Sequence, residues 1–260
     1  MGAIKLYKYL DFTGGLMMLH YSNLQFTNAT QLNDPFDCHP SLIDFSNVPK
    51  EACGGWTPAI IEELRRDPFR RTREKAWICS LSKIHDSILM WSYYSKHKGI
   101  CIGLDMEKAQ KYLSRIQGKV MIGCSEVEVQ YKDIVEKPDY FRDAKDFFHY
   151  QLSTKAKAWE HEQEVRLFIL DPSPTYMALL RDQNDAKGPI DWKEVRAFPK
   201  IGGECFESVY IGVNMNTDEK LKIISVARKL NPDIKIFQMG IDANAFKLNE
   251  ELIEAVLSHD

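Results

Sequence analysis

The polar residues best suited to chemistry lie between Trp159 and Leu167, where the chain reads WEHEQEVRL. On a β-strand, side chains alternate between two faces, so Glu162, Glu164 and Arg166 would share one face. The Cα atoms of the two glutamates would then be roughly 7 Å apart. Like charges that close raise a carboxyl pKa unless a cation neutralises them. One interpretation is that all three side chains, with Arg166 as a ligand-binding residue, point into a concave site. The other is an edge strand with a solvated charged stripe, and the pattern leaves both open.

Aromatic residues gather in a second stretch, LMWSYY at residues 89–94, which predicts an enclosed helix. Trp91 and Tyr94 on such a helix can stack against a flat ligand ring while their polar tips form hydrogen bonds. The same residues are equally typical of a helix that is simply part of the core. The sequence leaves both interpretations open.

A third stretch, NDPFD at residues 33–37, favours a turn, because proline forces the residue before it into an extended conformation. Its polar residues Asn33 and Asp34 either cap this turn or line a site.

The composition limits the choice of function. The net charge of -3 and pI of about 6.2 argue against a general nucleic-acid coat, although a local basic site stays possible in the arginine-rich region 62–75. No run approaches the 18 apolar residues of a membrane helix, and no signal peptide is recognisable. The six cysteines form no C-x-x-C pair, which predicts reduced thiols, no metal site and a cytoplasmic protein.

The hydrophobic patterns predict an α+β fold with a mixed, mainly antiparallel sheet and flanking helices. Whether this sheet is continuous or split stays open. The expected strands are Ile4–Tyr9, Leu24–Thr27, 76–82, 99–105, 125–131 and 164–170, and a helical region is expected from about Asp139 to Trp159.

The C-terminal part predicts a β-α-β unit, with strands at Ser208–Val213 and Ile234–Met239 around a helix at Asp218–Leu230. No linker rich in glycine, serine or proline precedes it. We therefore expect one domain over residues 1–260, with 217–250 as a subunit of that domain.

Five motifs occur in a fixed order: LYKY, NDPFD, CSLS, LMWSYY followed by GICIGLD, and W-x-H-E-x-E-V-R. Together they resemble a mainly bacterial, uncharacterised family, domain of unknown function 2971, from Leu6 to about Leu248. This chain departs from the family pattern at two places. Ser80-Leu81-Ser82 stands where C-F-S is usual, and Tyr93 stands where histidine is usual.

The Glu162-Gln163-Glu164 triplet is also similar to the E-x-E strand of ADP-ribosyltransferases. That resemblance implies that Glu164 stabilises oxocarbenium-like charge on the nicotinamide ribose, and that Glu162 faces the acceptor. It also implies a polar anchor on the first strand, here Lys8 or Tyr9, and a central serine or aromatic motif. Ser80, Ser82, Trp91 and Tyr94 are the candidates for that motif. NAD would be the substrate, and no cofactor would be required.

Three functions follow as hypotheses. The first is an NAD-using ADP-ribosyltransferase-like enzyme, as a toxin or phage-defence effector, with a protein or nucleic-acid acceptor. The second is a non-catalytic regulatory domain that binds a nucleotide or a protein. The third is a nucleic-acid enzyme that uses the acidic stripe and the arginine-rich helix. Convergence of Glu164, Tyr94, Tyr9 and Asn33 on one cleft would favour the first.

Overall fold

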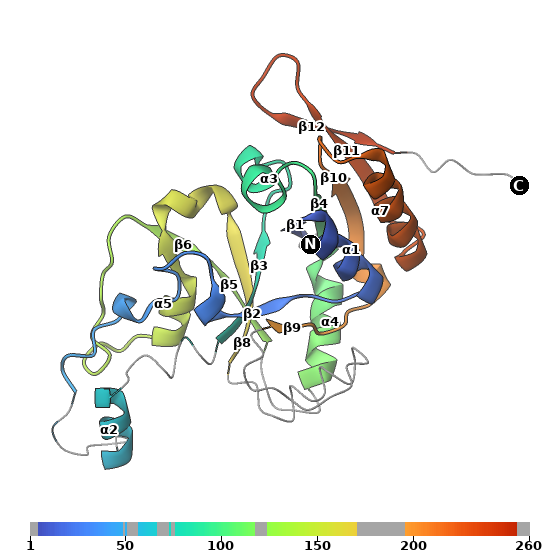
Figure 1. Cartoon of the computed structure of the whole chain (residues 1–260). Helices are drawn as coiled ribbons and strands as arrows, with labels where there is room; N and C mark the ends of the chain where they lie inside the picture. Colours follow the sequence, from blue (N-terminus) through green and yellow to red (C-terminus); the bar gives the residue numbers. More distant parts are fainter. Residues whose placement is uncertain are drawn as a thin grey trace, which may run out of the picture.

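The computed structural model describes residues 5–48, 50, 57–66, 73, 76–117, 124–170 and 196–253 (Figure 1). Among these residues, ten strands form one sheet, and the predicted α+β class with a mixed, mainly antiparallel sheet is confirmed. The strands of this sheet are β1 (Lys5–Leu10), β2 (Phe26–Asn28), β3 (Ala76–Ser82), β4 (Ile100–Asp105), β5 (Cys124–Glu128), β8 (Glu164–Leu170), β9 (Arg196–Ala197), β10 (Phe206–Ile211), β11 (Lys235–Ile241) and β12 (Leu248–Leu252).

A second, two-stranded parallel sheet is formed by β6 (Gln130–Lys132) and β7 (Thr154–Ala156). The helices are α1 (Phe12–Tyr21), α2 (Pro58–Arg66), α3 (Ile88–Ser95), α4 (Met106–Gln117), α5 (Phe147–Ser153) and α7 (Thr217–Leu230), with 3₁₀ turns η1 (Ala29–Gln31), η2 (Pro40–Leu42), η3 (Lys157–Glu162) and η4 (Gly203–Cys205). None of the helices in the described part of the chain has the length and apolar character to cross a membrane.

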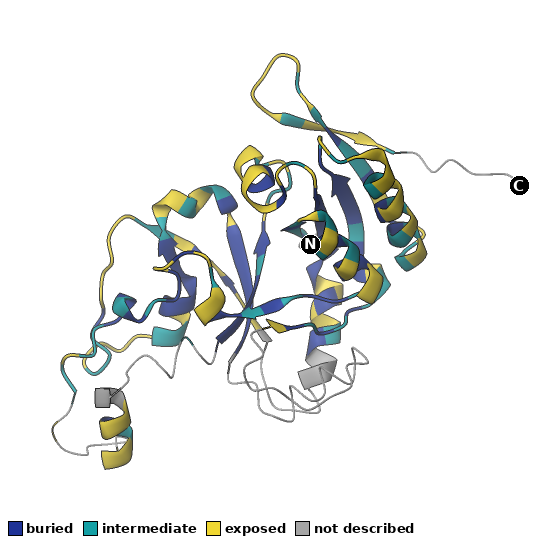
Figure 2. Cartoon of the chain, in the orientation of Figure 1, coloured by how far each residue is buried: buried dark blue, intermediate teal, exposed yellow. Residues whose placement is uncertain are grey.

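The order of the main sheet is β12-β11-β10-β4-β1-β3-β2-β9, and β8 pairs with both β3 and β5. Apolar residues of α1, α4 and α7 cover one face of this sheet and build the main core with alternate residues of β3, β4 and β8 (Figure 2). A smaller core on the other face includes Ala29, Cys38 and Leu152. Helix α3 packs by Met90 and Trp91 against β1 and β10.

The sheet opens between β1 and β2, two strands that face the same edge of β3. Strand β1 reaches β3 through one register pair, Tyr7 with Ser82, whereas β2 pairs with β3 at Trp77 and Ile78. In the gap, the Lys8 ammonium donates to the carbonyl oxygen of Ser80 at 2.7 Å. A side chain therefore takes the place of ladder hydrogen bonds where the two strands part.

Strand β8 has the predicted bounds, but two neighbouring predictions were wrong. The expected strand 125–131 breaks at Val129, whose N–H donates to the carbonyl of Glu164, and the chain then enters β6. The expected helix 139–159 is reduced to α5, which is followed by β7 and η3. Arg166 takes the carbonyl of Leu152 at 2.9 Å, an acceptor that a longer helix would have used.

The C-terminal β-α-β unit is formed by β10, α7 and β11, and its two strands are parallel as predicted. It joins the main sheet through the antiparallel pairing of β10 with β4. The sequence analysis missed β12, which pairs with β11 as an antiparallel edge strand and forms with it the hairpin that projects at the top of Figure 1. The single-domain assignment stays a prediction.

Candidate functional site

A cavity of about 280 Å³ lies at the opening of the sheet. We call it the carboxylate cavity. Its walls come from β1, β2, β3, α3, β7, η3, β8 and β9 and from the loop after η1. The predicted site residues among its lining are Lys8, Tyr9, Asn33, Ser82, Tyr94, Glu162 and Glu164. Residues from five separate parts of the sequence therefore converge here, as the first hypothesis requires.

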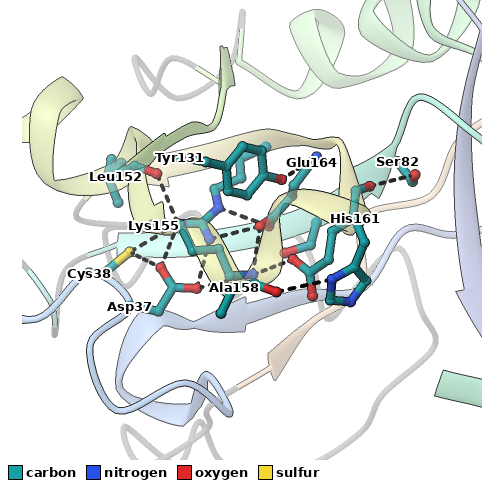
Figure 3. Close-up of polar contacts among 12 residues, drawn as sticks. Asp37, Cys38, Ser82, Tyr131, Leu152, Lys155, Ala158, His161 and Glu164 are labelled. Atoms are coloured by element: carbon teal, nitrogen blue, oxygen red, sulfur yellow. Dashed lines mark hydrogen bonds and ion pairs between the residues drawn. The ribbon is translucent and has the colours of Figure 1, made fainter. Parts of the chain in front are cut away.

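Glu164 lines this cavity and is held by two cations (Figure 3). Its Oε1 accepts from Nε of Arg166 at 2.8 Å, and its Oε2 accepts from Nη2 of Arg166 and from Nζ of Lys155, both at 2.9 Å. The backbone N–H of Glu164 donates to the hydroxyl of Tyr131 at 2.8 Å. Glu164 is thus fixed in position by both its side chain and its backbone.

Arg166 continues this network toward the loop after η1. Its Nη1 and Nη2 donate to the two oxygens of Asp37 at 2.8 and 2.7 Å, a bidentate pair of the kind that holds guanidinium and carboxylate groups in one plane. The Arg166 side chain is completely buried and does not line the cavity. Its role is to hold Asp37 and Glu164, and the expectation that it would face the ligand was wrong.

Glu162 belongs to the same cluster, which it joins through contacts with Tyr94 and Lys155. Its Oε1 accepts from the Tyr94 hydroxyl at 2.6 Å, and its Oε2 is paired with Nζ of Lys155, which also contacts Glu164. The prediction that Glu162 and Glu164 lie on one strand was wrong, because Glu162 ends η3 and β8 begins at Glu164. Gln163 lies between them with φ of 43°, in the left-handed region, and this turn brings the Glu162 side chain to the cluster.

The two glutamates have opposite electrostatic surroundings. Burial alone would raise the pKa of Glu164, but Arg166 and Lys155 outweigh it and hold that pKa well below the usual range. Burial raises the pKa of Glu162 above its usual value despite Lys155, and the charge of Glu164 adds to the effect. Burial also raises the pKa of Tyr94, with the carboxylate of Glu162 acting in the same direction. The two cations therefore favour the ionised form of Glu164, and burial favours the neutral form of Tyr94, which donates to Glu162.

Besides Arg166, two predicted site residues do not line the carboxylate cavity. Trp91 has no exposed surface, and its indole N–H donates to the carbonyl of His85 at 2.8 Å, so it is part of the core. Asp34 is buried and caps its own turn by accepting from the N–H of Phe36. The helix that carries Trp91 is not enclosed on all sides, since Leu89 and Tyr93 are exposed.

Four residues of the site were missed by the sequence analysis: Asp37, Tyr131, Lys155 and Arg196. Lys155 belongs to a segment that was predicted as helix, and Asp37 was included only as part of its turn motif. Among the described residues, no three side chains of His, Cys, Asp or Glu are grouped as metal ligands would be. The side chains of 64–72 in the arginine-rich region lie outside the described residues.

Comparison with known proteins gives a similarity to one family model over part of the chain, and no activity. No curated protein and no solved structure matches the chain. Residues 90–167 match the model of a family described as "Protein of unknown function (DUF2971)". This match spans α3 through most of β8, and it includes Tyr94, Lys155, Glu162, Glu164 and Arg166. The predicted resemblance to domain of unknown function 2971 is thus confirmed over residues 90–167, and this similarity carries no activity.

Proposed function

We propose that this protein is an ADP-ribosyltransferase-like enzyme that binds NAD in the carboxylate cavity and cleaves the bond between nicotinamide and ribose. The observation that carries the proposal is that Glu162 and Glu164 line one cavity and are joined through Nζ of Lys155, and the opposite directions of their pKa shifts agree with it. Paired acidic groups with separated pKa values are typical of sites that divide charge stabilisation from proton transfer.

Glu164 has the properties required of the charge-stabilising group. Cleavage of the glycosidic bond places positive charge on the anomeric carbon, and a fixed anion lowers the energy of that state without having to reorganise. Arg166 and Lys155 keep Glu164 ionised and immobile. The positive charges of Arg166 and Lys155 also weaken the field of Glu164 at the anomeric carbon. The stabilisation of a developing cation therefore depends on the net charge of the whole cluster.

That net charge favours a developing cation. The described side chains that meet in the cluster are three carboxylates, of Asp37, Glu162 and Glu164, and two cations, of Lys155 and Arg166. One negative charge is in excess when all five are ionised. The carboxyl with the fewest cation contacts is Glu162, which also has the raised pKa. We assign Glu162 the transfer of a proton from the acceptor, a role for which a raised carboxyl pKa is suited.

The remaining walls fit a nucleotide. Tyr9 and Tyr94 offer ring surface and hydroxyl groups, and Lys8 and Arg196 offer positive charge to a phosphate. The acceptor, a protein or a nucleic acid, would approach on the Glu162 side. The proposal includes a biological role for this enzyme as a toxin or as a phage-defence effector.

The test is to incubate the purified protein with NAD and to follow released nicotinamide, with and without cell extract. We expect Glu164→Gln to lower the rate per folded molecule by about 10²–10³, as the loss of one preorganised electrostatic contact does. Glu162→Gln should lower labelling of the acceptor more than it lowers hydrolysis of NAD. Glu128→Gln is the matched control, because Glu128 is an exposed carboxylate on the adjacent strand β5.

Equal rates for the wild-type protein and Glu164→Gln would contradict the assignment of the site while leaving an enzyme. A wild-type protein that binds NAD without releasing nicotinamide would support a second candidate, a non-catalytic domain that binds a nucleotide. The closed ion-pair network favours that candidate, because a buried Arg166 between Asp37 and Glu164 also serves to fix the fold. A protein that neither binds nor cleaves NAD would contradict the proposed function.

A further inference from the structure

A second cavity, of about 350 Å³, adjoins the carboxylate cavity. We call it the α1 cavity because helix α1 supplies much of its wall. Apolar and aromatic residues dominate this wall, among them Leu10, Met17, Met18 and Tyr21. Two residues line both cavities, Lys8 and Arg196. The two spaces therefore meet at a pair of cations.

The opening of the sheet explains why the cavities meet there. Along β1, Tyr7 and Tyr9 alternate with Lys8 and Leu10, so the two pairs project to opposite faces. The tyrosines line the carboxylate cavity, Leu10 lines the α1 cavity, and Lys8 lines both. The two cavities thus meet at Lys8, beside the part of β3 that neither β1 nor β2 pairs with.

A second contact links the cavities on β2. Gln25 lines the α1 cavity and Thr27 lines the carboxylate cavity, and the amide of Gln25 donates to the hydroxyl of Thr27 at 3.1 Å. Strand β9 pairs with β2 and places Arg196 opposite Thr27. Lys8 from β1 and Arg196 from β9 thus lie at the boundary that the two cavities share.

We infer that the two cavities together form one site for a dinucleotide with a pyrophosphate bridge. Lys8 and Arg196 would bind the pyrophosphate, because both offer positively charged donors at the boundary. The α1 cavity would take the second base, with Tyr21 and Met17 as ring and thioether contacts and Asn23 and Gln25 as amide partners for the edge of the base. This inference rests on the proposed function and names the part of NAD that the carboxylate cavity does not hold.

The experiment compares NAD with nicotinamide mononucleotide, which lacks the adenosine half, by titration calorimetry on the full chain. We expect the wild-type protein to bind NAD at least about tenfold more tightly than the mononucleotide, a difference of about 1.4 kcal/mol. Met17→Glu places a charge in the α1 cavity and should remove most of that preference. Met17 is 46% exposed, so the substitution does not disturb the core.

Leu221→Glu is the matched control, since Leu221 is an exposed apolar residue of a helix, 59% exposed, and lines neither cavity. It should leave the preference for NAD unchanged. Tyr21→Ala is a second test variant, which removes the ring without adding charge and should also reduce the preference.

Two results would overturn the inference, and they are distinguishable. If NAD and the mononucleotide bind equally, or if Met17→Glu weakens both by the same factor, the α1 cavity does not hold the second base, while the proposed cleavage of NAD still stands. If neither ligand binds and nicotinamide is not released from NAD, the proposed function fails, and the dinucleotide site fails with it.

Discussion

At the scale of single residues, the site depends on two glutamates in one buried cluster with opposite pKa displacements. A carboxyl whose pKa is raised by folding contributes stability that is fully present below its unfolded value, 4.5 for glutamate, and is lost as the pH rises through the folded pKa. Glu162 is such a group. We predict that the wild-type protein loses stability relative to Glu162→Gln as the pH rises from about 4.5, with a slope of up to about 1.4 kcal/mol per pH unit.

Denaturant unfolding at a series of pH values measures this difference. Glu160→Gln is the control, because Glu160 lies on the same 3₁₀ turn with an exposed side chain. It should follow the wild-type curve. A wild-type protein that instead gains stability relative to Glu162→Gln over this range would show that folding lowers the pKa of Glu162.

At the scale of elements, the junction between η3 and β8 decides where Glu162 points. Gln163 adopts the left-handed conformation there, with φ of 43° and ψ of 53°, and its carbonyl accepts from the N–H of Lys83 at 3.1 Å. β-branched residues are the least able to adopt this conformation, and glycine adopts it freely. We predict that Gln163→Val lowers the free energy of unfolding by about 1 kcal/mol or more, whereas Gln163→Gly changes it little.

Chemical unfolding of both variants tests this prediction. Gln163→Gly is its internal control, because it removes the same exposed side chain without straining the backbone. If both variants lose equal stability, the Gln163 side chain and not its backbone conformation carries the effect. If neither variant loses stability, the junction between η3 and β8 tolerates another backbone conformation at residue 163.

At the scale of the whole molecule, the cysteines report on the integrity of the fold. Cys38, Cys79, Cys101 and Cys205 are free thiols with no exposed surface, and they lie in separate parts of the chain. Burial raises the pKa of the Cys205 thiol to about 11, and the pKa values of the other three thiols are raised in the same way. Thiol reagents attack the thiolate, so these groups should react only when the fold opens.

We predict that these four cysteines are alkylated at least about a thousandfold more slowly in the native protein than in denaturant, given the usual stability of a folded domain. Cys53 and the side chain of Cys124 lie outside the described residues, so the measurement uses a variant with Cys53→Ser and Cys124→Ser. Mass spectrometry follows the labelling. Rapid labelling of native protein, or a mass change on adding reductant, would contradict the prediction.

The sequence by itself determined the elements whose pattern is local. Hydrophobic patterns predicted β3 and β8 with their observed bounds, and the helix and parallel strands of the C-terminal unit were predicted within two residues at each end. The polar motifs also marked most of the site, since Lys8, Tyr9, Asn33, Ser82, Tyr94, Glu162 and Glu164 line one cavity. These polar residues can be identified as site candidates from their types and spacing in the sequence.

Only the tertiary structure decided how those residues divide into ligand-facing and buried groups. Arg166 was expected beside the glutamates, but its bidentate partner Asp37 lies 129 residues away and draws the guanidinium into the core. Lys155 was missed because its segment resembles a helix, and the helix ends where Arg166 takes the carbonyl of Leu152. A buried charge is costly unless an opposite charge or a hydrogen-bonding group lies beside it. Contacts between segments that are distant in the sequence decide which group that is, so a local sequence pattern does not predict it.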